Sequence, residues 1–380
     1  MDDLELLTDY SDYLRKKKEE GKKIVAFMAH DNVPEELIDA VGFVPLRMIF
    51  AGNDNLMNES QSLNYLPAST CSFAQTCIGL FSLKPNVYKF LDMVDYFIVS
   101  NHCISDICTS EIITKYFFIP RLNCYSSYTQ SENALKYFKL ELLDFKKQLE
   151  IVSGKEISNE KIIESIKKYN LLKSKLVEVN DLIINGKEKL KIFQKAILYG
   201  PDSLSELENI IEKYKNQGSQ KNHNSKDLLF TGCSIFIGDY LIDLIEDGGG
   251  NIVFFDTWIG WNYFSQYIED IDINSNKEPL DLLVLRFKNN IYGDHTIPNF
   301  LENKIAYIKQ YIDDYKQETG KKLGVINHII KFCDHISIFQ SILKKKLQEK
   351  EIQVLNLERD YSKATRGQLS TRIEAFLEMM

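Results

Sequence analysis

Seven cysteines are the residues of this 380-residue chain whose type and spacing could support chemistry. They are Cys71, Cys77, Cys103, Cys108, Cys124, Cys233 and Cys333. An odd number of cysteines, behind an N-terminus that is acidic where an export signal would be basic and then apolar, argues against a disulfide framework. Free thiols are often buried as small hydrophobic groups, but several together can hold a metal cluster. Their positions on the secondary structure must decide between these uses.

Motifs of the common nucleotide and hydrolytic sites are absent from the sequence. No G-x-x-x-x-G-K-[ST] loop is present, and no G-x-G-x-x-G segment follows an expected strand. The glycines at 248–250 lie where an expected helix turns into an expected strand, so they meet a backbone requirement. No Ser-His-Asp arrangement stands out, and none of the six histidines forms a zinc-like pair with a nearby cysteine. The thiols remain the main candidates.

The composition excludes two classes of partner. With 46 Lys and Arg against 54 Asp and Glu, the net charge is −8, so nucleic acid is not an expected partner. No apolar run approaches the ~18–20 residues that a membrane-spanning helix requires, so no membrane association is expected. We therefore expect a cytoplasmic protein, and its length predicts two or three domains.

Two parts of the chain show short β-branched segments that alternate with helical ones. The expected strands lie at 23–28, 44–50, 95–100 and 117–122 in the first part, and at 228–232, 252–256, 280–285, 323–327 and 352–357 in the second. This alternation is typical of parallel βαβ units. The predicted fold is therefore α/β with two parallel-sheet domains.

Between these parts, hydrophobic residues recur at helical spacing with Lys and Glu among them, so we predict a helical region to which no chemistry is assigned. Residues 218–225 have the composition of a linker. The expected organisation is an N-terminal helix at 1–20, a first α/β domain at 21–128, the helical region at 129–222 and a second α/β domain at 223–380.

Three of the cysteines lie where a parallel sheet would bind a ligand. Cys71 opens an expected helix, Cys103 follows the strand at 95–100, and Cys333 follows the strand at 323–327. Ligands gather outside the carboxyl ends of parallel strands, and helix starts favour the thiolate. We therefore expect the three thiols to meet in a cleft between the domains. Three thiolates with no obvious fourth ligand would leave one iron of a cubane open to substrate.

Seven segments carry a resemblance to a known family over most of the chain. Their order and spacing are specific, and they are 33–47 (VPEELIDAVGFVPLR), 66–73 (LPASTCSF), 99–103 (VSNHC), 230–233 (FTGC), 331–334 (KFCD), 357–361 (LERDY) and 367–379 (GQLSTRIEAFLEM). With these segments the chain resembles the 2-hydroxyacyl-CoA dehydratase component family, the D-component group that also includes benzoyl-CoA reductase subunits. The resemblance implies two flavodoxin-like or Rossmann-like domains and one [4Fe–4S] cluster per chain, held by Cys71, Cys103 and Cys333.

The same resemblance implies a radical dehydration. Loss of water from (R)-2-hydroxyacyl-CoA to give 2-enoyl-CoA is difficult, because the β-proton is not acidic enough for ordinary acid–base catalysis. One electron from a low-potential cluster would convert the thioester carbonyl to a ketyl that expels the α-hydroxyl, and an open iron could act as a Lewis acid. The resemblance thus identifies a hydro-lyase subunit of an ATP-activated, anaerobic, cytoplasmic system of the kind used in amino-acid fermentation.

The implied partners are proteins of the same system and an acyl-CoA substrate. One is a homologous larger (alpha) subunit that forms a heterodimer with this chain, whose length favours the smaller (beta) subunit. The other is a separate ATP-dependent iron–sulfur activator, and the missing nucleotide motif agrees with ATP use by another protein. Two alternatives remain: a benzoyl-CoA-reductase-like subunit, or an electron-relay or scaffold subunit whose cluster does not contact substrate.

The other cysteines and polar residues lie outside this set of three cluster ligands. Some relatives hold a double-cubane cluster with six cysteines; here one of the extra positions is His30, a second cannot be found, and Cys233 matches a third. Cys77, Cys108 and Cys124 match no ligand position and are expected to be buried thiols. The acids Glu35 and Glu36 are expected to serve the dipole of a helix start. No catalytic base is assigned.

Overall fold

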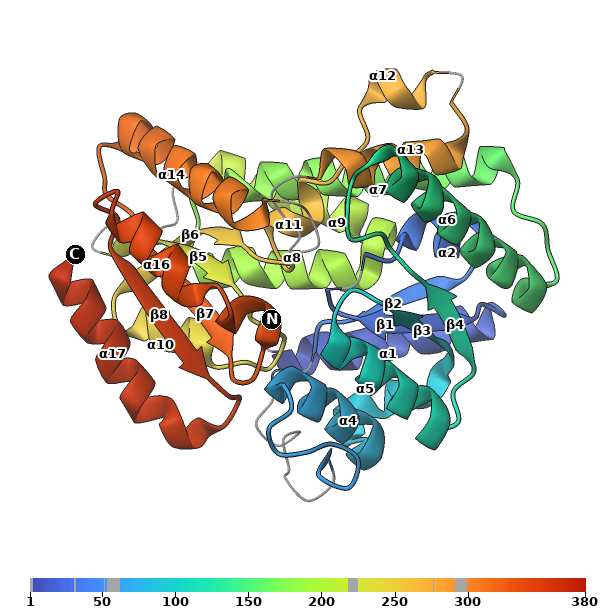
Figure 1. Ribbon diagram of the computed structural model, residues 1–380, viewed down its shortest axis with the longest axis horizontal. Coiled ribbons are helices and arrows are strands. Elements are labelled where there is room, and N and C mark those ends of the chain that lie inside the picture. Colours follow the sequence, from blue (N-terminus) through green and yellow to red (C-terminus); the bar gives the residue numbers. More distant parts are fainter. Residues whose placement is uncertain are drawn as a thin grey trace.

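Two parallel sheets flanked by helices form the framework of the protein (Figure 1). The computed structural model describes residues 3–30, 32–50, 52, 62–217, 225–275, 277–290 and 299–380. The predicted linker at 218–225 lies outside the described residues except for Ser225. The two sheets have the same strand order, and every paired strand is parallel, so the predicted α/β fold is confirmed.

The first sheet has the order β2-β1-β3-β4. Its strands are β1 (Ile24–Met28), β2 (Val44–Met48), β3 (Val94–Ser100) and β4 (Arg121–Cys124). Every residue of β1 is buried, as expected for a strand covered on both faces. The last strand begins at Arg121, so the expected strand at 117–122 was placed a few residues too early. The helices of this part are α1 (Asp3–Glu19), α2 (Glu35–Ala40), α4 (Ser72–Leu83), η2 (Asn86–Met93) and α5 (Ile104–Tyr116).

The second sheet has the order β6-β5-β7-β8. Its strands are β5 (Lys226–Gly232), β6 (Gly250–Asp256), β7 (Gly324–Ile330) and β8 (Val354–Arg359). The helices in this part of the sequence are α10 (Leu241–Asp247), α11 (Trp261–Phe264), α12 (Asp270–Ile273), α13 (Pro279–Asn289), α14 (Phe300–Thr319), α15 (Asp334–Ser337), α16 (Gln340–Gln348), η4 (Lys363–Thr365) and α17 (Arg366–Met379).

The expected strand at 280–285 is wrong, because this segment lies inside α13. Pro279 occupies the first helical turn, where its missing N–H costs nothing, and Arg286 lies in the last turn. Leu280, Leu283 and Phe287 are buried at helical spacing, and the helix packs on the helical region rather than joining a sheet. A short apolar run fits a buried strand and a buried helix equally well.

Helices fill the chain between the two sheets, as the hydrophobic spacing predicted. They are α6 (Glu132–Ser153), α7 (Asn159–Asn180), α8 (Gly186–Tyr199), η3 (Gly200–Ser203) and α9 (Leu204–Gln217). Helix α8 contacts β2 of the first sheet and β6 of the second. One hydrophobic cluster runs from Ile24 through Phe193 to Phe230, so both sheets share a core and hold their strand ends in a defined relation.

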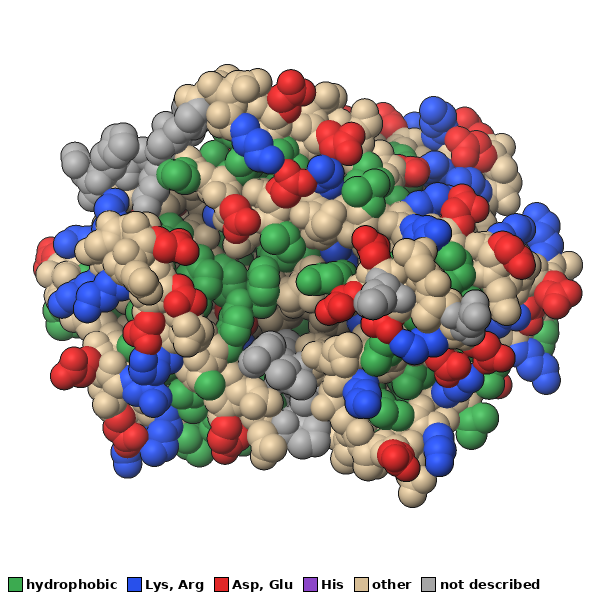
Figure 2. Space-filling model, turned by 90° about the horizontal axis from the view of Figure 1, so that it is seen from above, with side chains coloured by type: hydrophobic (Ala, Val, Ile, Leu, Met, Phe, Trp, Pro, Cys, Tyr) green, Lys and Arg blue, Asp and Glu red, His purple; other side chains and the backbone are tan. Residues whose placement is uncertain are grey.

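The outer surface of this framework is mixed. In the view from above, Figure 2 shows hydrophobic side chains gathered around a hollow near the middle of the face, with charged side chains distributed around it. Among the helices within the described ranges, none is both long and apolar enough to cross a membrane.

Candidate functional site

The three predicted cysteines each occupy the N-cap of a helix that follows a strand or loop. Cys71 caps α4, Cys103 caps α5 after β3, and Cys333 caps α15 after β7. The first N–H groups of a helix lack partners within the helix and favour negative charge. Neighbouring thiols and burial raise the pKa of all three cysteines, and backbone N–H groups of the following turn oppose this rise by favouring the thiolate. Local sequence therefore gives all three thiols a setting suited to ligation.

Contacts across the molecule bring the N-caps from the two sheets together. Ser72, next to Cys71, donates its backbone N–H to the carbonyl oxygen of Lys331 at 3.2 Å. Phe332 then adopts a left-handed φ of +63°, which is uncommon for an aromatic residue and turns the chain so that Cys333 caps its helix. The thiols of Cys71 and Cys333 are hydrogen-bonded to each other. The expected approach of these two cysteines is thus observed.

Cys103 lies at the same site, and Cys233 joins it. Burial raises the pKa of Cys103, the carboxylate of Asp106 raises it further, and Cys71 and Cys333 contribute less. The Sγ atom of Cys233, which follows β5, lies 3.8 Å from the Sγ atom of Cys333. Hydrogen bonding to Cys233 and burial raise the pKa of Cys333. Four thiols from both sheets therefore converge at the carboxyl ends of parallel strands, where ligands are expected.

The remaining cysteines match none of these positions. Cys77 is buried in α4, and Cys124 is buried at the end of β4, as expected. Cys108 is exposed, so the expectation of a buried thiol is wrong for this residue. It lies in the middle of α5, on a side of the helix that faces solvent.

A buried hydroxyl beside the thiols indicates a sulfur-containing ligand. Tyr361 is completely buried, and no group within the described part of the chain forms a hydrogen bond with its hydroxyl. Burial raises the pKa of Tyr361, and Cys233 and Cys71 lie close enough to raise it further. An unsatisfied buried donor is costly unless it meets an acceptor. Soft thiolates with a spare donor beside them fit a thiolate-held iron–sulfur cluster, whose sulfurs accept such hydrogen bonds.

A second set of donors lies next to Cys103. One atom each of His30, Cys103 and Asp106 lie within 4.8 Å of one another, and all three residues are candidates for metal ligation. The Nε2 atom of His30 lies 2.5 Å from a carboxylate oxygen of Asp106. Burial raises the pKa of Asp106 well above its ordinary value. Asp106 was not among the predicted site residues, although an acid in the first helical turn after a cysteine is a recognisable sign of a possible ligand.

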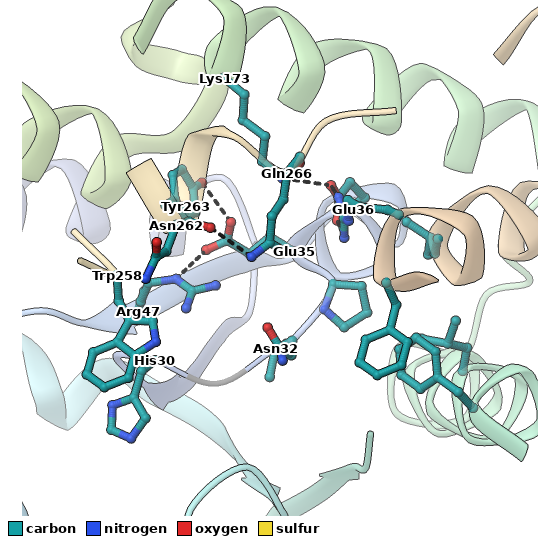
Figure 3. Close-up of a pocket in the computed structure, with 17 residues that line it drawn as sticks. His30, Asn32, Glu35, Glu36, Arg47, Lys173, Trp258, Asn262, Tyr263 and Gln266 are labelled. Atoms are coloured by element: carbon teal, nitrogen blue, oxygen red, sulfur yellow. Dashed lines mark hydrogen bonds and ion pairs between the residues drawn. The ribbon is translucent and has the colours of Figure 1, made fainter. Parts of the chain in front are cut away.

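A polar pocket adjoins this second set of donors and shares His30 with it (Figure 3). His30 lines it and stacks on Trp258, with ring centroids 4.7 Å apart. Glu35 accepts a hydrogen bond from Arg47 at 3.1 Å and another from the hydroxyl of Tyr263 at 2.8 Å. One wall is apolar, formed by Phe138, Leu142, Leu283 and Phe287. The pocket thus offers an apolar surface opposite a set of ordered polar groups, as small-molecule sites commonly do.

A buried ion-pair network forms the deep end of the pocket. Glu36 binds both terminal nitrogens of Arg286, and the Nζ atom of Lys173 lies 4.0 Å from the same carboxylate. Burial alone would raise the pKa of Glu36, but Arg286 and Lys173 lower it to about 2. Glu35 and Glu36 are therefore ion-pair partners and do more than serve the helix dipole. Lys173 and Arg286 come from regions to which the sequence assigned no chemistry.

Lys173 predicts a distinctive pH dependence of stability. Burial and the neighbouring Arg286 lower its pKa from 10.5 to about 7. Between pH 7 and 10 the unfolded chain binds more protons at this residue than the folded chain, so its contribution to stability rises with pH. We expect the free energy of unfolding of Lys173→Met, relative to that of the wild type, to fall by up to about 1.4 kcal/mol per pH unit above pH 7.

Urea unfolding at about pH 6.5, 7.5 and 8.5 in the presence of a thiol reductant measures this difference. Lys168→Met is the matched control, because Lys168 is on the same helix and its pKa is raised by Glu164. The control difference should stay constant over this range. A constant difference for Lys173→Met as well would contradict the assignment.

Gly232 holds the end of β5 close to β7. Its φ is +95°, and a Cβ atom there would overlap the carbonyl oxygen of His328. Gly249 has a similar φ of +90° but open space around its Cβ position, so it is a matched control for the backbone penalty alone. We expect Gly249→Ala to lower the free energy of unfolding by about 1 kcal/mol and Gly232→Ala by about 1–3 kcal/mol more. Equal losses in urea unfolding would show that the close approach is absent in solution.

The sequence of this chain is similar to that of a protein family and to those of several named proteins. Residues 32–380 match the family described as 2-hydroxyglutaryl-CoA dehydratase, D-component. The (R)-phenyllactyl-CoA dehydratase beta subunit of Clostridium sporogenes is 24% identical over 380 residues, covering 97% of this chain and 95% of that protein. The (R)-2-hydroxyglutaryl-CoA dehydratase subunit beta of Acidaminococcus fermentans is 23% identical, with coverage of 97% and 95%. The putative dehydratase subunit YjiM of Escherichia coli K12 is 22% identical, with coverage of 92% and 89%.

Proposed function

This chain belongs to the 2-hydroxyglutaryl-CoA dehydratase D-component family, and from that premise we propose that it is the iron–sulfur subunit of an ATP-activated 2-hydroxyacyl-CoA dehydratase. The family and the relatives are named as dehydratase subunits, so the chain is a subunit of a hydro-lyase. In the proposed reaction, the assembled enzyme removes water from an (R)-2-hydroxyacyl-CoA and releases a 2-enoyl-CoA.

The meeting of cysteine N-caps from two separate sheets is the observation that supports this function. Cys71, Cys103 and Cys333 are proposed to hold one [4Fe–4S] cluster. When bound, the cluster supplies the low-potential electron that makes the thioester carbonyl reactive toward loss of the α-hydroxyl. The backbone N–H groups at the three helix starts would favour its negative charge. The buried hydroxyl of Tyr361 would supply a further donor.

The pocket beside the cysteines suits the acyl part of a CoA thioester. Its apolar wall, formed by α6 and α13, offers contact for the acyl chain. The ion pairs of Glu35 and Glu36 hold the polar groups in fixed positions, so they need not reorganise when a ligand enters. His30 connects the pocket to Cys103, because it lines the pocket, stacks on Trp258 and has a ring nitrogen within 4.8 Å of the Cys103 thiol.

The proposed partners are a homologous larger subunit and an ATP-dependent iron–sulfur activator. Two relatives are named as beta subunits, which supports an assembly of two kinds of subunit. Exposed apolar side chains accompany the site, because Ile104 follows Cys103 and Phe332 precedes Cys333, with Ile338 on the next helical turn. Exposed apolar residues grouped around a functional site are typical of a surface that docks another protein.

Anaerobic purification followed by iron and acid-labile sulfide analysis tests the proposal. We expect about four irons and four sulfides per chain, and an EPR signal of a reduced cluster after dithionite treatment. The complex with its partner subunit and an activator should then dehydrate (R)-2-hydroxyglutaryl-CoA or (R)-phenyllactyl-CoA, the substrates named for the relatives. Absence of iron under reconstituting conditions would overturn the function and leave only the fold.

A further inference from the structure

Cys233 and Cys333 form a close pair of thiols that come from neighbouring strands. Their Sγ atoms lie 3.8 Å apart. Cys233 directly follows β5, and Cys333 lies just after β7, the strand that pairs with β5. A disulfide bond is about 2.05 Å long, so the two sulfur atoms need to approach by less than about 2 Å to form one. The spacing is therefore that of two thiols that can be oxidised to each other.

One strand restrains the backbones of both cysteines. The N–H of Cys233 donates to the carbonyl oxygen of His328 at 2.9 Å, and the N–H of Cys333 donates to the carbonyl oxygen of Ile330 at 2.9 Å. His328 and Ile330 both belong to β7. Because the same strand holds both residues, the thiols stay close together in the folded chain. A reaction between them is intramolecular and benefits from a high effective concentration.

A buried polar network strengthens the restraint on Cys233. Its carbonyl oxygen lies 2.8 Å from Nδ1 of His328. Arg359 donates from Nε to Nε2 of the same histidine at 3.1 Å, so Nδ1 carries the proton that binds Cys233. Arg359 forms an ion pair with Asp239, and both side chains are wholly buried. The position of Cys233 beside β7 is thus fixed from two sides.

The two thiols differ in their access to solvent. Cys333 is partly exposed, and it follows Phe332, whose side chain is 41% exposed. Cys233 is only 3% exposed. A small molecule that arrives from solvent therefore reaches Cys333 first, and Cys233 then meets what is attached to Cys333. This is the arrangement of an attacking thiol with a resolving thiol beside it.

Cys71 is a second neighbour of Cys333, because their thiols are hydrogen-bonded to each other. It belongs to the part of the chain around the first sheet, and its segment is joined to that of Cys333 by the hydrogen bond between Ser72 and Lys331. Cys233 and Cys333 are instead held by one strand of one sheet. Cys233 is therefore the favoured partner of Cys333, and a bond between Cys71 and Cys333 is the competing outcome that the test must detect.

We propose that Cys233 and Cys333 are a redox-active pair, which a low-molecular-weight disulfide oxidises when the chain carries no cluster. The sulfur of Cys333 attacks the small disulfide, forms a mixed disulfide and releases one small thiol, which takes the proton of Cys333. The sulfur of Cys233 then attacks that of Cys333, and the second small thiol leaves with the proton of Cys233. Two protein thiols are thus oxidised to one disulfide, and the small disulfide is reduced to two thiols.

The disulfide would control the loading of the cluster, and this part of the inference rests on the proposed function. Cys333 is one of the three proposed ligands, and a metal ligand must be a thiolate. An oxidised chain is therefore unable to assemble the cluster until a reductant restores the thiols. The disulfide is also reversible, so it keeps both sulfur atoms from oxidation to the irreversible sulfinic and sulfonic acids.

The test uses the full-length chain, freed of iron by a chelator under reducing and anaerobic conditions and then treated with oxidised glutathione. The remaining thiols are alkylated, and the peptides of an unreduced proteolytic digest are identified by mass spectrometry. We expect a disulfide that joins the peptides of Cys233 and Cys333. The exposed Cys108 should carry a glutathione adduct, which shows that the oxidant reacted with the chain.

Single substitutions test the order of the two steps. In Cys233→Ala, Cys333 should retain glutathione, because the resolving thiol is missing. In Cys333→Ala, the buried Cys233 should be modified at least about ten times more slowly than Cys108, because thiol exchange depends on access. Cys77→Ala is the matched control, since it removes another buried thiol, and it should form the same disulfide as the wild type. Far-UV circular dichroism shows whether each variant is folded.

Reconstitution with iron and sulfide separates this inference from the proposed function. The oxidised chain should take up less than about one iron, and the same sample after treatment with dithiothreitol about four. A disulfide between Cys71 and Cys333, an adduct on wild-type Cys333 without a disulfide, or full iron uptake by the oxidised chain would overturn the inference and leave the proposed function intact. A disulfide between Cys233 and Cys333 in a chain that takes up no iron even when reduced would support the thiol pair and overturn the function.

Discussion

Cys103→Ala is expected to reduce the iron content from about four per chain to less than one and to abolish the EPR signal of the reduced cluster. Cys103 caps α5 and is the proposed ligand contributed by the first sheet at β3. Without it only two of the three proposed ligands remain, which are too few to hold a cubane. Dehydration of either CoA thioester by the assembled complex should fall by more than about 100-fold, since even changes outside the ligand shell of metal sites can reach that size.

Cys108→Ala provides the matched control for this substitution. Cys108 lies one turn further along the same helix and is exposed, so its replacement removes a thiol without altering the site. Iron content, EPR spectrum and unfolding free energy should remain within error of the wild type, because exposed substitutions usually change stability by less than about 0.5 kcal/mol. If Cys103→Ala keeps a full complement of iron, Cys103 is not a ligand and the proposed set must be revised.

Arg359→Met is expected to cause the largest loss of stability, about 3–5 kcal/mol. Arg359 pairs with Asp239, and neither side chain has any exposure. Removing the guanidinium leaves a buried carboxylate that still accepts a hydrogen bond from the backbone N–H of Leu241 at 2.9 Å. It also removes the hydrogen bond to His328, which in turn holds the backbone of Cys233. Urea unfolding of the reduced apo-protein measures the loss.

Two companion variants separate burial from charge in this result. Lys346→Met removes an ion pair with Glu349 in which both side chains are about half exposed, and it should cost less than about 1 kcal/mol. The double variant Asp239→Leu with Arg359→Met should recover part of the loss, because no unpaired charge remains buried. A cost for Arg359→Met no larger than that of Lys346→Met would show that the buried pair does not form in solution.

The same Arg359→Met variant also connects stability to the site. With His328 released, the loop that carries Cys233 loses one of its two backbone restraints. Iron should then be lost faster to a chelator even under conditions in which the chain remains folded. Cys233 is therefore positioned by His328 of β7 and Arg359 of β8, and not by the strand that precedes it.

Local sequence determined much of this protein. The alternation of β-branched and helical segments predicted two parallel sheets, because a strand covered on both faces must be apolar throughout. Cys71 was expected at a helix start, and Cys103 and Cys333 were expected just after strands; the structure finds each one at an N-cap. These features depend on neighbours within a few residues, so they are legible from the chain itself. The segment at 280–285 was assigned wrongly, because a short run of mostly apolar residues suits both a strand and a helix.

The tertiary structure alone decided which side chains meet. Lys173 and Arg286 lie 113 residues apart in the sequence, yet both contact Glu36. Cys233 and Cys333 are exactly 100 residues apart, and only the pairing of β5 with β7 sets their thiols 3.8 Å from each other. The spacing of hydrophobic residues shows which face of each segment is buried. It does not show which distant segment covers that face. The membership of the site is therefore a property of sheet order and shared core packing, which no local pattern encodes.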